Sequence, residues 1–257
     1  SANAVLSHEE KEAGVALIDI GGGTTDLAIF KDGIIRHTAV IPFGGNVITE
    51  DIKEGCSIIE KQAELLKVKF GSAWPGENKE NEIVSIPGLR GRDPKEISLK
   101  NLSKIINART VEIIEQVYLE IKNYGHEEQK KKLIAGIVLT GGGSQLKHLK
   151  QLVEYVTGMD TRVGYPNEHL AGDTDKNVTS PLYATAVGLV MDGLSKIEKN
   201  NIENTEFENS DDESEVSETT VENNLEEIEK KTEKKIKRES FLDKLTKNLQ
   251  DFLDNAE

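Results

Sequence analysis

The chain has 257 residues, a formal net charge of −14 and one cysteine. A single cysteine cannot form an internal disulfide, and no Cys/His cluster has zinc spacing, which excludes a disulfide scaffold and a zinc module. No stretch approaches 18 consecutive apolar residues and no signal peptide is visible, so we expect a cytoplasmic protein without a membrane span. Because the chain begins at Ser1 and not at Met, we expect a fragment or a processed piece.

The negative charge is concentrated near the C-terminus. Residues 203–229 hold twelve carboxylates and no lysine or arginine, so the rest of the chain is close to neutral. The net charge argues against a nucleic-acid partner, and we expect none. It says little about the site, which must be sought in the nearly neutral region.

Composition divides the chain into three regions. Residues 1–197 alternate apolar runs with amphipathic stretches, which predicts a folded domain. Residues 198–233 are rich in Glu, Asn, Ser and Thr and almost free of large apolar side chains, which predicts an acidic, disordered linker. Helical periodicity returns in residues 234–257.

Three strands are predicted first, at 15–20, 27–30 and 34–41. Asp32-Gly33 joins the last two as a two-residue hairpin turn, in which both positions need positive φ. The later elements are a helix at 46–70, an irregular insert at 71–95 with a short strand at 83–86, a helix at 99–124, a strand at 133–140, a helix at 145–156, and a helix opened by Ser180-Pro181 as N-cap and first turn. This order predicts a mixed α/β domain.

A glycine-rich loop follows the first strand. Three consecutive glycines allow close approach of a ligand, and their N–H groups can converge on phosphate oxygens. Asp19, at the strand end, is placed to hold Mg²⁺ through water. The loop joins strand to strand, which fits neither a dinucleotide loop nor a Walker loop. A simple glycine-rich turn is the alternative. The candidate residues are Asp19, Gly21, Gly22, Gly23, Thr24 and Thr25.

Two weaker signals lie further along the chain. Gly141, Gly142 and Gly143 stand between a strand and a helix and could pack against a flat base or sugar, although such loops often contain glycine without a ligand. Glu64 and Lys67 share a helix face and could reach a ribose, although such a pair is more often solvated surface. The five histidines are scattered without ligand spacing, so no catalytic residue is predicted.

The order of these three elements resembles a known superfamily. IDIGGGTTDLAIF resembles the second phosphate loop of the actin/Hsp70 ATPases, VLTGGGSQL their adenosine motif, and AELLK their ribose-contacting helix. PFGGNVITEDI and PLYATAVGLV resemble the FtsA family of bacterial cell-division proteins in particular. The resemblance covers about residues 3–197. It implies an actin-like (ribonuclease H-like) second lobe that binds ATP and Mg²⁺, with the candidate residues above facing the nucleotide.

The resemblance also implies what is missing and what is added. An FtsA has an earlier lobe with another phosphate loop, so this fragment holds half of the nucleotide cleft, and at most weak ATPase activity is expected. Residues 72–124 take the place of a small inserted subdomain that in FtsA receives the C-terminal peptide of FtsZ. Its basic residues would suit an acidic peptide, although ordinary surface charge is the alternative: Arg90, Arg92, Lys95, Lys100, Lys104 and Arg109.

The last region predicts a membrane-targeting amphipathic helix. Ser240 is a good N-cap, and the apolar residues after it fall on one helical stripe behind a basic cluster that would meet anionic lipid. A helix that docks on a partner protein is the alternative. The stripe consists of Phe241, Leu242, Leu245, Leu249, Phe252 and Leu253.

The resemblance implies an ATP-binding, polymerising adaptor. It would tether FtsZ filaments to the cytoplasmic face of the cell membrane at the division site, as a peripheral protein that also binds copies of itself. The alternative is another actin/Hsp70-fold ATPase or a fragment of a small-molecule kinase. A kinase of this fold, however, would have no use for the acidic linker and the terminal helix.

Overall fold

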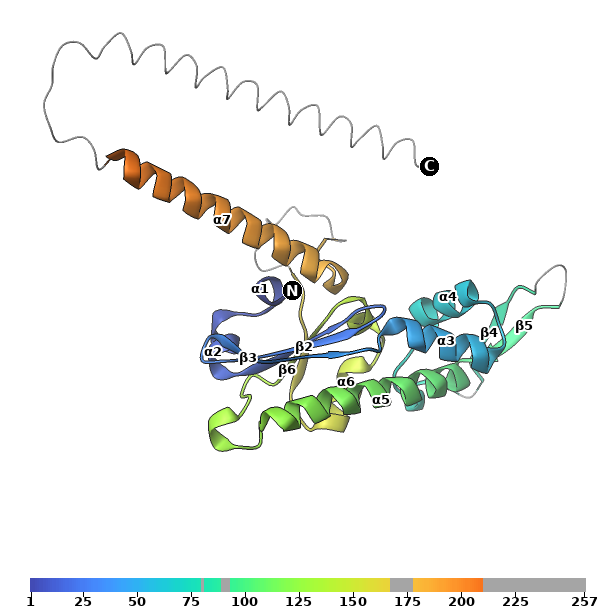
Figure 1. The fold of residues 1–257 in the computed structure, drawn as a ribbon. Coiled ribbons are helices and arrows are strands. Elements are labelled where there is room, and N and C mark those ends of the chain that lie inside the picture. The colour runs from blue at the N-terminus through green and yellow to red at the C-terminus, as the bar shows by residue number, and fades with distance from the viewer. Residues whose placement is uncertain (80, 89–92, 167–177, 210–257) are drawn as a thin grey trace, which may run out of the picture. The chain divides into compact units, whose positions relative to one another are not determined.

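The computed structural model describes residues 1–79, 81–88, 93–166 and 178–209 (Figure 1). The chain divides into two compact units, Ser1–Lys199 and Asn200–Glu257. Of the second unit, the described residues are 200–209, which end a helix. The predicted linker beyond residue 209 and the predicted terminal helix at 234–257 lie outside the described residues.

A five-stranded sheet organises the first unit, in the order β3-β2-β1-β6-β7. Its strands are β1 Val15–Ile20, β2 Thr25–Lys31, β3 Ile34–Ile41, β6 Ile137–Thr140 and β7 Thr161–Val163. The first three are antiparallel, and β6 and β7 add to β1 in parallel. Asp19 therefore lies opposite Thr140, and the loops that follow β1 and β6 emerge at the same edge of the sheet.

Helices cover both faces of the sheet (Figure 1). One face packs on α5 (Leu99–Tyr124) and α6 (Leu149–Thr157), around a core that includes Ile18, Ile29 and Val117. The other face packs on α1 (Ala2–Val5) and the first turns of α7 (Ala184–Asn209), around Val15 and Leu17. The other helical elements of this part of the chain are α2 His8–Ala13, η3 Gln129–Lys131, η4 Gly142–Gln145 and η5 Pro181–Tyr183.

A second group of elements has its own core. It contains α3 (Gly45–Cys56), α4 (Glu60–Phe70), η1 (Pro75–Glu77), the two-stranded sheet of β4 (Ile83–Ile86) and β5 (Lys95–Ser98), and the first half of α5. Their apolar side chains form one buried cluster: Ile48, Ile52, Cys56, Ala63, Leu66, Ile86, Ile97, Leu102, Ile106 and Ile113. We call this group the small subdomain. Its packing extends to α3 and α4, which the predicted bounds of 72–124 leave out.

Several predicted elements are found within a residue or two, including the strands at 15–20 and 34–41, the helix at 99–124 and the turn at Asp32 and Gly33, both of which have positive φ. The predicted helix at 46–70 is wrong, because it consists of two helices. α3 ends where Ser57 takes a left-handed conformation with φ 49°, and the N–H groups of Ser57 and Ile58 close the last turn. The apolar period continues across the break since both helices face the same core.

Other differences are smaller. β5 was not predicted, and the predicted strand at 133–140 begins only at Ile137, after Gly136 turns the chain with φ 68°. The predicted helix at 145–156 begins later, at Leu149 as α6, because Gln145 still ends the 3₁₀ turn η4. The helix opened by Ser180 is confirmed, since the Ser180 side chain accepts a hydrogen bond from Leu182 N. It continues to Asn209, beyond the predicted start of the linker at residue 198.

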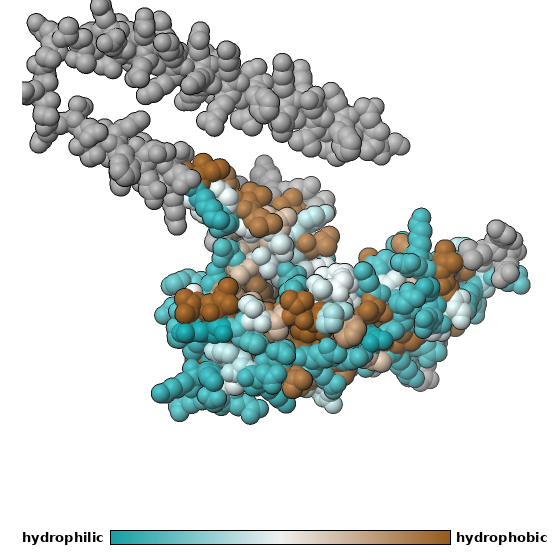
Figure 2. Space-filling view, viewed as in Figure 1, coloured by the Kyte–Doolittle hydropathy of each residue, from teal (hydrophilic) through white to brown (hydrophobic). Residues whose placement is uncertain are grey.

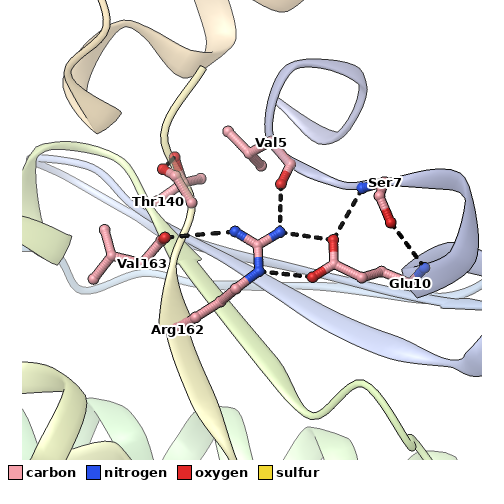
Figure 3. Close-up of polar contacts among 7 residues, drawn as sticks. Val5, Ser7, Glu10, Thr140, Arg162 and Val163 are labelled. Carbon is pink, nitrogen blue, oxygen red and sulfur yellow. Dashed lines mark hydrogen bonds and ion pairs between the residues drawn. The ribbon is translucent and has the colours of Figure 1, made fainter. Parts of the chain in front are cut away.

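The N-terminal segment is tied to the sheet by an ion pair (Figure 3). Arg162 on β7 meets both carboxylate oxygens of Glu10, with Nε–Oε1 2.7 Å and Nη2–Oε2 2.6 Å, and also donates to Val5 O at 2.7 Å. Glu10 accepts the N–H of Ser7 in a capping box that starts α2. Partial burial raises the pKa of Glu10, but the bonds from Arg162 and Ser7 outweigh it and hold the pKa below its ordinary value.

We expect Glu10→Gln to lower the free energy of unfolding at pH 7 by about 1 kcal/mol, since Arg162 is partly exposed and the pair is screened. A lowered native pKa gives stability that is present above the unfolded value of 4.5 and fades as the pH falls through the native pKa. The difference between wild type and variant should therefore shrink on acidification below 4.5. Urea unfolding at several pH values measures it, with exposed Glu115→Gln as control. A difference that stays constant with pH would contradict this assignment.

Apolar side chains also reach the surface, in separate patches among hydrophilic ones (Figure 2). More than half of the side-chain surface is exposed at Ile34, Ile35 and Val40 on edge strand β3, and at Leu189 and Leu194 on α7. No helix in the described ranges is both long enough and apolar enough to cross a membrane.

Candidate functional site

A cavity of about 730 Å³ opens where the loops after β1 and β6 meet the small subdomain. Its walls come from elements far apart in the sequence, including α3, α4, α5, η4 and the start of α7. Eight of the residues selected from the sequence line it: Asp19, Gly21, Gly22, Glu64, Lys67, Gly141, Gly142 and Gly143. Three separate motifs are thus brought together in one place.

The loop after β1 turns tightly, with Gly21 N donating to Thr24 O at 2.9 Å. Gly22 and Gly23 are exposed, and their N–H groups donate to none of the described residues. Two neighbouring N–H groups without a partner can receive an anionic oxygen. The loop therefore has the donors that an oxyanion needs.

The N-terminus of α3 supports this loop from behind. Gly45 N donates to Gly21 O at 2.9 Å, and Asn46 N donates to Gly22 O at 2.8 Å. A Cβ on Gly44 would lie 2.6 Å from Gly21 O, so only glycine allows this approach. Gly45 and Asn46 also line the cavity. Neither residue was predicted as a site residue, although the adjacent glycines Gly44 and Gly45 at the start of a helix were a visible signal.

The two threonines of the loop are placed differently from the prediction. Thr25 is fully buried and its hydroxyl donates to Phe43 O at 2.8 Å, while the hydroxyl of exposed Thr24 donates to Asp26 Oδ2 at 3.1 Å. Neither threonine lines the cavity, nor does Gly23. The reason is the alternation of β2, which begins at Thr25 and turns that side chain toward the protein.

Two of the glycines after β6 are required by packing alone. A Cβ on Gly141, whose φ is 80°, would lie 2.4 Å from Asp19 Oδ1 and 2.5 Å from Ile20 O, and one on Gly143 would lie 2.3 Å from Ile20 Cγ2. These glycines let the second loop approach β1. A Cβ on Gly142 would meet only the side chain of Leu182, at 3.0 Å, so Gly142 is the position left open toward the cavity.

Asp19 stands between the two loops at the end of β1. Its Oδ2 accepts a hydrogen bond from Thr185 Oγ1 on α7 at 3.0 Å, and both residues line the cavity. The sequence analysis missed Thr185, because the contact joins residues 166 positions apart. This bond fixes the orientation of the carboxylate.

Glu64 and Lys67 are joined by a third residue that the sequence did not reveal. The Lys67 ammonium lies 2.7 Å from Glu64 Oε2 and 2.7 Å from the hydroxyl of Thr49, which in turn donates to Glu64. Burial raises the pKa of Glu64, but the bonds from Lys67 and Thr49 outweigh it and lower that pKa. The pair is therefore a fixed part of the cavity wall, in which Glu64 is held as a carboxylate.

Another part of the wall is apolar, and it includes Ile48 on α3, Ile113 on α5 and Leu146 directly after η4. A flat aromatic group would find contact area there. One cavity thus offers an N–H donor, an apolar surface and a carboxylate.

The basic residues of the small subdomain are only partly available. Arg109 is paired with Asp51, at 2.6 and 3.0 Å, and with Glu112, so its charge is already compensated. Lys95 is exposed and donates to Ser57 O at 3.4 Å, and Lys104 is exposed. Arg90 and Arg92 lie outside the described residues.

Comparison with known proteins identifies relatives of this chain. The family model described as "Cell division protein FtsA" matches residues 16–188. Proteins of that name are 41% identical over 196 residues in Pseudomonas aeruginosa (76% of this chain, 46% of the relative) and 36% identical over 210 residues in Escherichia coli K12 (77% and 50%). The chain thus spans about half the length of the curated relatives it matches.

Solved structures give the fold. MreB5 of Spiroplasma citri bound to ADP matches with a TM-score of 0.60 and 25% identity, over 79% of this chain and 59% of that one. The PilM-PilN type IV pilus biogenesis complex matches with a TM-score of 0.54 and 19% identity, over 72% and 47%. The predicted actin-like α/β fold is confirmed.

Proposed function

Because the chain belongs to the FtsA family of cell division proteins, we propose that it binds ATP with Mg²⁺ and acts as an adaptor that ties FtsZ filaments to the membrane. The observation that carries the proposal is the cavity in which both glycine loops and the Glu64–Lys67 pair meet. Family membership disfavours the kinase alternative.

The cavity fits a nucleotide in three places. The N–H group of Gly22 in the cavity wall suits a phosphate oxygen, the apolar wall beside Ile113 suits a base, and Glu64 suits ribose hydroxyls. The related MreB5 of Spiroplasma citri has been solved with ADP and with AMPPNP. We propose the same class of ligand here.

Asp19 suits a magnesium ion that is held mainly by phosphates. The described residues contain no group of three or more His, Cys, Asp or Glu side chains that could hold a metal. Mg²⁺ keeps several waters and commonly takes one or two carboxylates beside substrate phosphates, so a single aspartate fits. The ion would neutralise phosphate charge there, while Asp19 orients one of its waters.

The small subdomain is the proposed receiver of the FtsZ peptide. Membership of the FtsA family is the main support. Exposed Lys95 and Lys104 add local support, as does Ile83, whose apolar side chain is exposed on the two-stranded sheet. An acidic peptide with apolar residues would find both kinds of contact.

The terminal stripe beginning at Phe241 is the proposed reversible membrane anchor, which would place the protein on the cytoplasmic face of the membrane at the division site. Self-association into filaments is also proposed. It is supported by exposed apolar side chains such as Leu189 and Val40. Many aligned copies would multiply a weak membrane affinity.

The nucleotide part is tested with the 257-residue chain. Titration with ATP–Mg²⁺ to millimolar concentration, followed by amide NMR, should shift the signals of Gly22, Gly23 and Gly142. ADP should act in the same way, and the apolar wall should respond to both. Absence of any saturable shift near these glycines would contradict the proposal.

A further inference from the structure

The ammonium group of Lys67 is surrounded by protein oxygens. It lies 2.7 Å from Glu64 Oε2, 2.7 Å from Thr49 Oγ1 and 2.9 Å from Gly45 O. A lysine ammonium has three N–H donors, and three oxygens are already beside it. Only 13% of the Lys67 side chain is exposed, so little of it can meet a ligand.

Glu64 is the open member of the pair. Its Oε2 is held by Lys67 and Thr49, whereas Oε1 makes no hydrogen bond with any residue in the described ranges. The side chain is 48% exposed and lines the cavity. Since a carboxylate is an acceptor only, its free oxygen suits hydroxyl donors.

Thr49 fixes this arrangement from the side of α3. It is 4% exposed, and its hydroxyl lies between the ammonium of Lys67 and the carboxylate of Glu64. A hydroxyl can accept one bond and donate another, which is the role required here. Valine has nearly the same shape and lacks both abilities.

We propose that Thr49 and Lys67 are positioning residues, which hold the carboxylate of Glu64 so that its free oxygen meets the ribose hydroxyls of the proposed nucleotide. The inference rests on the proposed nucleotide function. It separates roles that the motif assigns jointly to Glu64 and Lys67.

The same lysine connects the sugar end of the cavity to the phosphate end. Lys67 donates to Gly45 O, and Gly45 N donates to Gly21 O in the loop after β1. A change at the carboxylate can thus reach the glycine loop through its ion pair with Lys67 and these two hydrogen bonds. Lys67→Met should weaken binding of every nucleotide, in addition to its effect on the sugar.

The test compares ATP with 2′,3′-dideoxy-ATP, each with Mg²⁺, by NMR titration of the 257-residue chain. The wild type should bind ATP about tenfold more tightly, as expected for one lost charge-assisted hydrogen bond or more. Thr49→Val should reduce that preference to near unity, as should Glu64→Ala, and Thr49→Ser should keep it. The double variant Glu64→Ala with Thr49→Val should lose no further preference.

A readout without nucleotide accompanies the titration. The Glu64 carboxyl carbon reports its pKa by NMR, and that pKa should rise in Thr49→Val and in Lys67→Met, because each variant removes a bond that lowers it. If Thr49→Val binds ATP and prefers it to 2′,3′-dideoxy-ATP as strongly as the wild type does, this inference is overturned and the proposed nucleotide function is not. A preference that survives in Glu64→Ala and disappears on adding Lys67→Met would do the same. Absence of ATP binding by the wild type would overturn the proposed function as well.

Discussion

Replacing Gly22 and Gly142 together with valine should leave the chain folded and reduce its affinity for ATP–Mg²⁺ by at least about 100-fold. The two side chains would fill the approach to the loop N–H groups, and two charge-assisted hydrogen bonds are worth about 3 kcal/mol or more. A Cβ at either position meets only side-chain atoms, of Asn46 at 3.1 Å and of Leu182 at 3.0 Å. Both neighbours can move, so the fold should tolerate the change.

The matched control is Gly193→Val on α7. A Cβ at this position would have no atom within 4 Å, and Gly193 does not line the cavity. It should bind like wild type. Gly141→Ala is the opposite case, because its Cβ would meet backbone at a positive φ, and it should lose stability by a few kcal/mol. Circular dichroism and thermal unfolding separate the two effects. A folded double variant with wild-type affinity would contradict the nucleotide site.

The second large effect concerns the proposed membrane-binding stripe that begins at Phe241. Phe241→Glu with Leu249→Glu should release the chain from vesicles that contain anionic lipid. Each apolar side chain contributes up to about 1.5–3 kcal/mol when fully buried, and interfacial burial is partial, so the loss in partitioning should exceed tenfold. Sedimentation with vesicles measures it. The binding should also weaken with salt, because a basic cluster contributes.

The control adds the same charge outside the apolar stripe. Gln250→Glu with Asn255→Glu changes the net charge equally and should sediment with vesicles far better than the first variant. If both double variants bind as the wild type does, the helix docks on a protein and not on lipid. Equal release of both would mean that charge alone governs the binding.

The parts of the fold that sequence predicted are those set by local patterning. The apolar run of β1, the positive-φ pair at Asp32 and Gly33, and the long amphipathic period of α5 each depend on neighbours in sequence. The missed break after Cys56 has a tertiary cause. Both helices bury their apolar faces in one core, so the period continues through the left-handed turn at Ser57.

Site residues that belong to a short sequence motif could be predicted. Site residues that are identified only by their tertiary contacts could not. The glycine loops and the Glu64–Lys67 pair are visible as short patterns. Thr49 and Thr185 are not, because each acts through a residue distant in sequence. The packing role of Gly141 also depends on its distance from Ile20 O, which no local pattern contains.

The proposal that one chain joins FtsZ to a membrane surface can be tested directly. Its most direct measurement is co-sedimentation of FtsZ with anionic vesicles in the presence and absence of the chain. FtsZ should sediment with the vesicles only when the chain is added, and neither the Phe241→Glu, Leu249→Glu variant nor an FtsZ without its C-terminal peptide should support it. Equal sedimentation of FtsZ with and without the chain, while the chain itself binds the vesicles, would contradict the account.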